Sequence, residues 1–239
     1  MIIFSITILT LIASVVGTIT GFGLSTVMIP VLLIFFPPIE AIFLVSIIHW
    51  FGNIWKVLLF RKGFDLRLLL LFGITGFFTS YLGAFISLGS NEEILLRIFG
   101  VFLFAYALFL IFQTSFKVLA SNSTALLGGL LSGFFAGIFG MGGAIRSMFL
   151  STFNLPKKVY IATVGAIGLL IDSTRIVTYF IGGAQLSELL WWGLPLFITI
   201  SFIGAKIAQN IVDKIPQDRF RMVIALFLLI IGIKLIIWP

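Results

Sequence analysis

The chain alternates long apolar runs with short polar or proline-containing breaks, and this pattern predicts its architecture. A helix needs about 20 apolar residues to cross a bilayer core of about 30 Å, whereas a barrel strand needs only about 10 alternating ones. Most of the runs are unbroken over the longer distance, so the pattern favours helices. The eight apolar runs are residues 2–36, 41–60, 68–88, 94–112, 121–153, 159–181, 190–209 and 220–238.

Two of these runs are too long for one crossing, and glycines interrupt both. Each is predicted to form a helical hairpin with a short second arm of ~20 Å. The predicted arms are residues 2–20 and 24–36 in the first run, and 121–139 and 143–155 in the second. The chain would then contain ten helical elements; the alternative is eight plain crossings.

The two halves of the chain resemble each other. A shift of 119 positions places Gly21 on Gly140, Asn53 on Asp172 and Lys56 on Arg175. We therefore predict two repeats of about five elements each, residues 1–115 and 120–239, with a linker at 113–124. Internal repeats of this kind are typical of transporters.

Charge predicts how the repeats relate to the membrane. The loop at 61–67 is basic and its counterpart at 182–188 has no basic residue, whereas Lys157 and Lys158 have no basic counterpart at 37–40. Basic loops stay in the cytoplasm, so this alternation predicts inverted repeats. It also explains the net charge of +7 without a nucleic-acid partner.

Composition supports a multi-pass protein of the cell (plasma or inner) membrane. Apolar residues make up 61% of the 239 residues and charged residues only 10%, against about 45–50% and 25% in soluble domains. The sequence has no cysteine and only one histidine, His49. This excludes thiolate chemistry and clustered Cys or His metal ligands, so no metal or other cofactor is expected.

The glycine breaks are the first candidate site. Glycine permits a sharp reversal of the backbone, and the free N–H groups of a following helix can bind an anion. Ser25 or Thr26 would cap the first such helix. Close helix packing through small residues is the alternative interpretation. The candidate substrate-binding residues at the breaks are Gly21, Gly23, Ser25, Thr26, Gly140, Gly142 and Gly143.

Polar residues on otherwise apolar helices are the second signal. Arg146 follows the second break, where it would contact substrate, pair with Asp172 or snorkel to the interface. Asp172 and Arg175 share a helix face, either as an intrahelical ion pair or, for Arg175, as a further substrate contact. His49, Asn53 and Lys56 form the matching face of the other repeat. We assign His49, Asn53, Lys56 and Asp172 to coupling or charge pairing, although Lys56 also lies close enough to a helix end to snorkel.

The sequence resembles the sulfite exporter TauE/SafE family over nearly its whole length. The resemblance rests on Gly21-Phe22-Gly23 with Pro30, on Gly128-Gly129-Leu130-Leu131-Ser132-Gly133, and on Gly140-Met141-Gly142-Gly143; the segments 154–158 and 204–208 also match. It departs from the family pattern at Leu24, Ser25, Ala144 and Phe149. The resemblance implies a membrane transporter of small, often sulfur-containing anions such as sulfite or sulfonates.

These observations predict an all-helical secondary transporter, not an enzyme, that moves a small sulfur-containing anion by alternating access, coupled to protons or membrane potential. Its expected partners are the anionic substrate, membrane lipid and further copies of the chain. Two alternatives stay open. One is a cation-coupled carrier or channel with Asp172 and Asn53 as its cation site. The other is a membrane subunit without transport activity.

Overall fold

The computed structural model describes residues 1–60, 63–112, 118–211 and 217–239, with the side chains of 217–221 and 223 outside the description. Every regular element in these ranges is a helix, which confirms the predicted all-helical class and its ten elements. The helices are α1 (Ile2–Thr20), α2 (Ser25–Leu32), α3 (Pro38–Leu59), α4 (Leu66–Gly89), α5 (Glu92–Phe112), α6 (Asn122–Phe139), α7 (Gly142–Ser151), α8 (Lys157–Ile181), α9 (Glu188–Ile211) and α10 (Gln217–Ile237).

Seven of these helices are long and apolar enough to cross a membrane: α1, α3, α4, α5, α6, α8 and α9. Both over-long runs are broken, as predicted. Their second arms are shorter than expected, because α2 has 8 residues and α7 has 10. Each short helix ends five residues before a proline, Pro37 or Pro156, so the proline limits the arm but does not set its last helical residue. At ~12 and ~15 Å, neither short helix can span the bilayer core alone.

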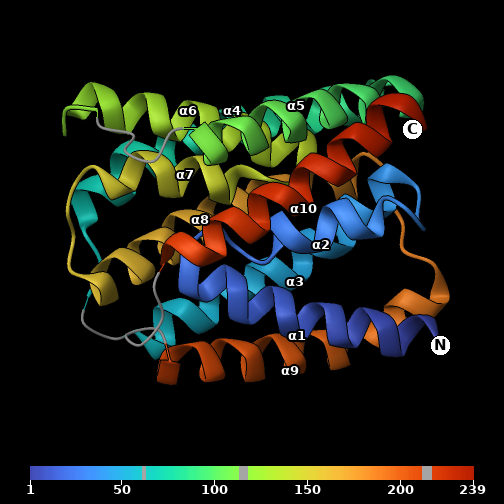
Figure 1. Ribbon diagram of the computed structural model, residues 1–239, viewed down its shortest axis with the longest axis horizontal. Helices are drawn as coiled ribbons and strands as arrows, with labels where there is room; N and C mark the ends of the chain where they lie inside the picture. The colour runs from blue at the N-terminus through green and yellow to red at the C-terminus, as the bar shows by residue number, and fades with distance from the viewer. Residues whose placement is uncertain (61–62, 113–117, 212–216) are drawn as a thin grey trace.

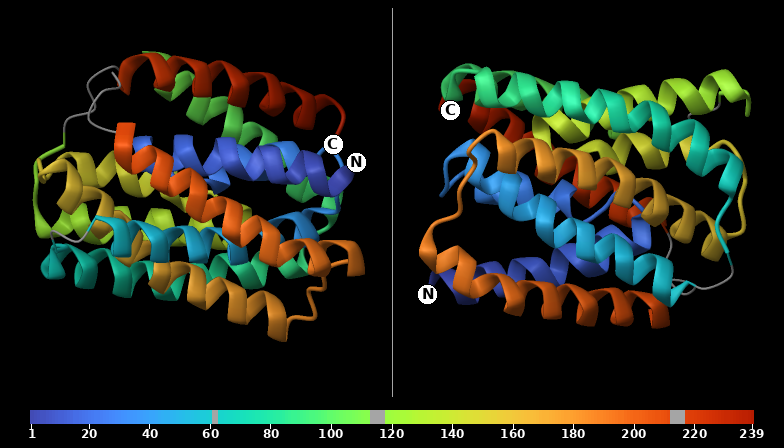
Figure 2. Two further views of the ribbon diagram at one scale, coloured as in Figure 1. Left: turned by 90° about the horizontal axis from the view of Figure 1, so that it is seen from below. Right: turned by 180° about the vertical axis from the view of Figure 1, so that it is seen from behind.

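The long helices run along one common direction, and both chain termini lie at the same end of the molecule (Figures 1 and 2). α1 packs against α9, α4 against α6, and α5 against α10. α3 packs against α8, and these two helices also contact α9 and α4 respectively. The two short helices, α2 and α7, contact each other.

Burial separates inner helices from outer ones. More than half of the membrane-length window is buried in α3, α6 and α8, but only about a third in α4. The outer face of α4 exposes aromatic side chains such as Phe78 and Phe85, which suits contact with lipid tails. Its inner face packs closely on α6, because the hydroxyl of Thr79 donates to the Leu130 carbonyl at 2.9 Å. The polar residues of α3 and α8 therefore lie inside a helical shell.

Candidate functional site

Two glycines end the long arms of the hairpins with the same backbone geometry. Gly21 follows α1 with φ 76° and ψ −4°, and Gly140 follows α6 with φ 73° and ψ 5°. Residues with a Cβ rarely adopt this left-handed conformation, whereas glycine adopts it freely. The backbone reversal predicted from the glycines is therefore confirmed at both positions.

The two breaks lie against each other. Ser147 of α7 donates its hydroxyl hydrogen to the Gly21 carbonyl at 2.5 Å. Gly143 approaches the Phe22 carbonyl so closely that a Cβ at Gly143 would overlap it. Residues more than a hundred positions apart thus form one polar junction between the first break and α7.

The predicted capping of the first short helix is wrong. α2 begins at Ser25, its N-cap position is Leu24, and no side chain caps it. The Thr26 hydroxyl instead donates back to the Phe22 carbonyl at 3.0 Å. The helix begins too early for Ser25 to occupy the N-cap position, so the buried Ser25 hydroxyl is left without a hydrogen-bond partner among the described residues.

The polar faces of α3 and α8 meet at Asp172. Its Oδ2 accepts a hydrogen bond from Asn53 Nδ2 at 2.8 Å and lies 2.8 Å from His49 Nδ1. Its Oδ1 lies 2.9 Å from Arg175 Nη2. Lys56 Nζ donates to Asn53 Oδ1 at 3.1 Å. Lys56 is only 2% exposed, so it is part of this network and does not snorkel.

Arg146 enters the same region from α7. It is 1% exposed, and its Nε and Nη2 atoms have no hydrogen-bond partner among the described residues. Gly168 of α8 brings it close to Asn53: a Cβ at Gly168 would lie 3.1 Å from Arg146 Nη2 and would overlap Asn53. The guanidinium group therefore lies inside the cluster with two of its nitrogen atoms still able to donate hydrogen bonds.

The buried charges of this cluster do not cancel. Lys56, Arg146, Asp172 and Arg175 are the buried Lys, Arg, Asp and Glu side chains of the described chain. They comprise three cations and one carboxylate. The two guanidinium groups alone outnumber the carboxylate, and arginine stays protonated in proteins. In these described parts of the chain, no three His, Cys, Asp or Glu residues lie together as metal ligands would.

The glycine breaks face different members of the cluster. A Cβ at Gly23 would overlap Nε2 of His49, and a Cβ at Gly140 would lie 2.8 Å from Nη1 of Arg175. Arg175 also donates from Nη1 to the Ala136 carbonyl at 3.2 Å. The predicted site residues therefore contact the polar junction or the charged cluster beside it, apart from Ser25 and from Gly142, which packs on Ser132 and Ala136 of α6; Thr26 reaches the junction through its bond to the Phe22 carbonyl. Ser25 and Thr26 are both fully buried at the start of α2.

Three residues of this region were not predicted from the sequence as site residues. Ser147 connects the two breaks through its bond to Gly21, and Gly168 leaves space for the Arg146 side chain beside Asn53. Tyr160 of α8 packs beside Gly21 and donates its hydroxyl hydrogen to the Ser147 carbonyl at 3.3 Å. Ser147 directly follows Arg146, and Gly168 lies one turn before Asp172, so spacing from the charged residues was the available signal.

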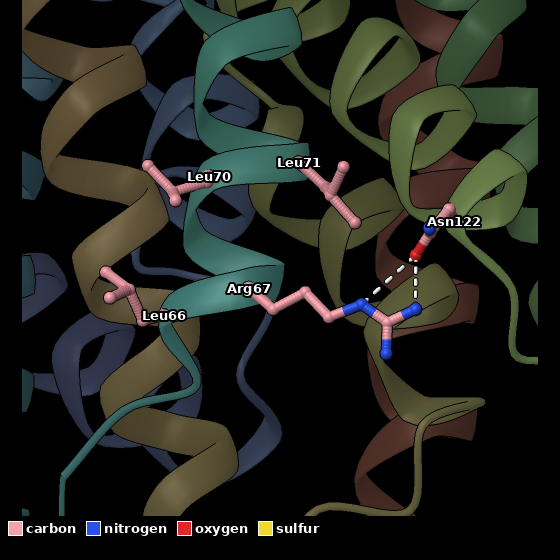
Figure 3. Close-up of a pocket in the computed structure, with 5 residues that line it drawn as sticks. All are labelled: Leu66, Arg67, Leu70, Leu71 and Asn122. Carbon is pink, nitrogen blue, oxygen red and sulfur yellow. Dashed lines mark hydrogen bonds between the residues drawn. The ribbon is translucent and has the colours of Figure 1, made fainter.

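A surface pocket at the start of α4 and α6 is a separate feature. It is lined by Leu66, Arg67, Leu70, Leu71 and Asn122 (Figure 3). Arg67 Nε donates to Asn122 Oδ1 at 3.1 Å (Figure 3). Because Arg67 is exposed, it matches one of the predicted loop cations and contributes no buried charge.

Comparison with known families adds one finding. A family model described as sulfite exporter TauE/SafE matches residues 6–235. The match covers all ten helices apart from the ends of α1 and α10. No curated protein matches the chain.

Proposed function

Because the chain belongs to the sulfite exporter TauE/SafE family of membrane transporters, we propose that it is a secondary transporter of a small sulfur-containing oxyanion in the plasma membrane. The family assignment gives the class of protein. The substrate, its binding residues and the mechanism are inferred from the cluster at the glycine breaks.

The excess of buried cations carries this proposal. Three cations and one carboxylate lie in a region with no access to bulk water. An uncompensated buried charge costs several kcal/mol, and ionisable residues inside membranes are retained for function. An anion between Arg146 and the rest of the cluster would remove that cost. The unpartnered Nε and Nη2 atoms of Arg146 provide two parallel donors, the geometry in which guanidinium binds oxyanions.

The backbone at the breaks supplies further donors. The first four N–H groups of α7, which begins at Gly142, have no acceptor within their own helix. The N-terminus of a helix also carries partial positive charge, which favours an anion. We assign the anion to Gly142, Gly143 and Arg146 of the second break, beside Gly21 and Gly23 of the first, where the Gly23 N–H already donates to the Gly17 carbonyl. Arg175, held by Asp172, lies beside Gly140 and adds the second guanidinium group, and the buried hydroxyls of Ser25 and Thr26 lie at the start of α2.

Alternating access would use two inverted repeats, residues 1–115 and 120–239. Four observations support the repeats. Gly21 and Gly140, 119 positions apart, share one backbone conformation. Asn53 and Asp172 are also 119 apart and bond to each other, as equivalent residues beside a two-fold axis would. The contact of α1 with α9 has its counterpart in that of α6 with α4. Both termini lie at one end (Figure 1), which requires an even number of crossings overall. Rocking of one repeat against the other would expose the junction to either side in turn.

A cation site at Asp172 and Asn53 is the weaker alternative. Asp172 already lies within 2.9 Å of Arg175 and within 2.8 Å of His49 and Asn53. Two guanidinium groups nearby would repel a further cation.

Flux through proteoliposomes of the purified protein tests the proposal. The panel contains sulfite, sulfate, thiosulfate, sulfoacetate and acetate, and protein-free liposomes measure leakage. We expect saturable uptake of a sulfur oxyanion that reverses with the anion gradient and is unaffected by replacing Na⁺ with K⁺. Uptake that follows a cation gradient, or no uptake by folded protein, would refute the proposal.

A further inference from the structure

His49 is held in a defined orientation with one ring nitrogen left over. The side chain is 2% exposed, and its Nδ1 lies 2.8 Å from Asp172 Oδ2. In neutral histidine one ring nitrogen is protonated, and a hydrogen bond to a carboxylate places that proton on the bonded nitrogen. The other nitrogen, Nε2, is then a free acceptor. Neither ring nitrogen makes a hydrogen bond of regular geometry with the described residues, but Nδ1 lies beside the carboxylate whereas Nε2 lies against Gly23.

The charged groups around His49 come from three helices. Lys56 lies on α3 itself, Asp172 and Arg175 on α8, and Arg146 on α7 beside Asn53 and Gly168. The short helix α2 carries no titratable side chain. The charged side chains of α9 that the structure describes, Glu188 and Lys206, are exposed. His49 therefore faces one carboxylate in a region that already has an excess of cations.

We infer that His49 is the site of a proton that crosses the membrane together with the anion. This inference rests on the proposed function and assigns its coupling step. Nε2 accepts a proton from water on one side of the membrane, an N–H bond forms, and Asp172 stays paired with the resulting imidazolium. The same N–H bond breaks when the proton leaves to water on the other side, so no other reactant is needed.

The excess of cations makes proton and anion depend on each other. Protonation of His49 adds a fourth positive charge to the cluster, which is favourable only when an anion compensates it. By linkage, the protonated histidine strengthens anion binding by the same factor. The position of Nε2 against Gly23 places this proton at the break where the anion is proposed to bind. The expected result is symport of an anion with a proton.

Concentrative uptake separates this step from anion binding. Proteoliposomes receive an inside-alkaline pH gradient while K⁺ and valinomycin clamp the membrane potential at zero. For one-to-one coupling, a gradient of about one pH unit supports about tenfold accumulation. The probes are the five anions of the panel above, with leakage into protein-free liposomes subtracted. Exchange of internal for external anion without any gradient is measured on the same vesicles.

The informative variant is His49→Asn, because the asparagine amide can still donate to Asp172. We expect accumulation under the pH gradient to be lost. Exchange at saturating anion should persist but need a higher anion concentration, because the neutral asparagine lacks the charge that strengthens anion binding. Ser46→Ala is the matched control, since Ser46 is a buried polar residue of α3 whose hydroxyl, among the described residues, donates to the Phe43 carbonyl of its own helix; it should keep both activities.

Each other outcome overturns the inference. Concentrative uptake by folded His49→Asn, or by His49→Gln if the first variant does not fold, would show that the proton travels elsewhere. Loss of exchange by a folded variant even at saturating anion would place His49 in anion binding. If the wild-type protein exchanges anion but does not accumulate it under the pH gradient, proton coupling is refuted and the proposed function is left intact. Absence of exchange for all five anions would refute the proposed function and this inference together.

Discussion

The two glycine breaks share a backbone conformation but differ in the side chains around them. Gly21 and Gly140 adopt nearly the same left-handed conformation. The short helix after the first break has no charged side chain, whereas α7 after the second carries Arg146. The position equivalent to Arg146 is Val27. At the equivalent glycines, a Cβ at Gly21 would meet the Tyr160 ring, whereas one at Gly140 would meet the Arg175 guanidinium.

The backbone reversal and the cation that follows it are therefore separate features of the break. Because the first break forms with Val27 at the position equivalent to Arg146, a cation after the glycines is not required for the backbone reversal. The second break therefore holds the guanidinium groups for another reason, which we propose is the anion. Substitutions of equivalent positions in the two breaks can test that separation.

The largest effect is expected from Arg146→Ala. Removing one partner of a buried charged contact costs about 2–5 kcal/mol, so sulfur-anion uptake should fall by about 100-fold, roughly to the protein-free background. The variant should remain folded, because truncation also removes an uncompensated buried charge. Initial uptake rates and a detergent-solubilised melting curve measure the two quantities.

Val27→Ala is the matched control at the equivalent position of the first break. Loss of a partly buried methyl pair should reduce melting temperature slightly and leave uptake within about threefold of wild type. Equal losses of uptake in the two variants would mean that the breaks do not differ in chemistry. Wild-type uptake by Arg146→Ala would remove Arg146 from the anion site.

An intermediate effect is expected from Gly23→Ala. Gly23 has φ 84°, and the new Cβ would overlap His49 Nε2. Gly183 has φ 82° with nothing within 4 Å of a Cβ position, so Gly183→Ala suffers the same backbone strain, about 1–2 kcal/mol, without the overlap. We expect a lower melting temperature and about tenfold lower uptake for Gly23→Ala than for Gly183→Ala, an added cost of about 1.4 kcal/mol. Similar results for both variants would show that only strain matters at the first break.

The sequence predicted the parts of this arrangement that depend on local physics. Run length against bilayer thickness predicted the helices, and glycines in over-long runs located the breaks. Spacing by three and four placed His49, Asn53 and Lys56 on one face, and the same rule joined Asp172 to Arg175. The cap was mispredicted at Ser25, because the start of α2 depends on how it packs. The junction of Ser147 with Gly21 was not predictable by spacing rules, since it joins residues 126 apart that meet only after α2 and α7 have docked.

The smallest effect is expected from that junction. Ser147→Ala removes the hydrogen bond to the Gly21 carbonyl, and a buried bond of this kind contributes about 1 kcal/mol. Ser151 lies one turn further along α7 and donates at 2.6 Å to Met148 of its own helix, so Ser151→Ala controls for loss of a hydroxyl from α7. We expect Ser147→Ala alone to lower the melting temperature and to reduce uptake by about fivefold, which corresponds to about 1 kcal/mol. Ser147→Thr, which keeps the donor, should restore part of the uptake. If Ser147→Ala instead matches Ser151→Ala, the breaks are held together by the packing of Gly143 on Phe22, and the hydroxyl does not align them.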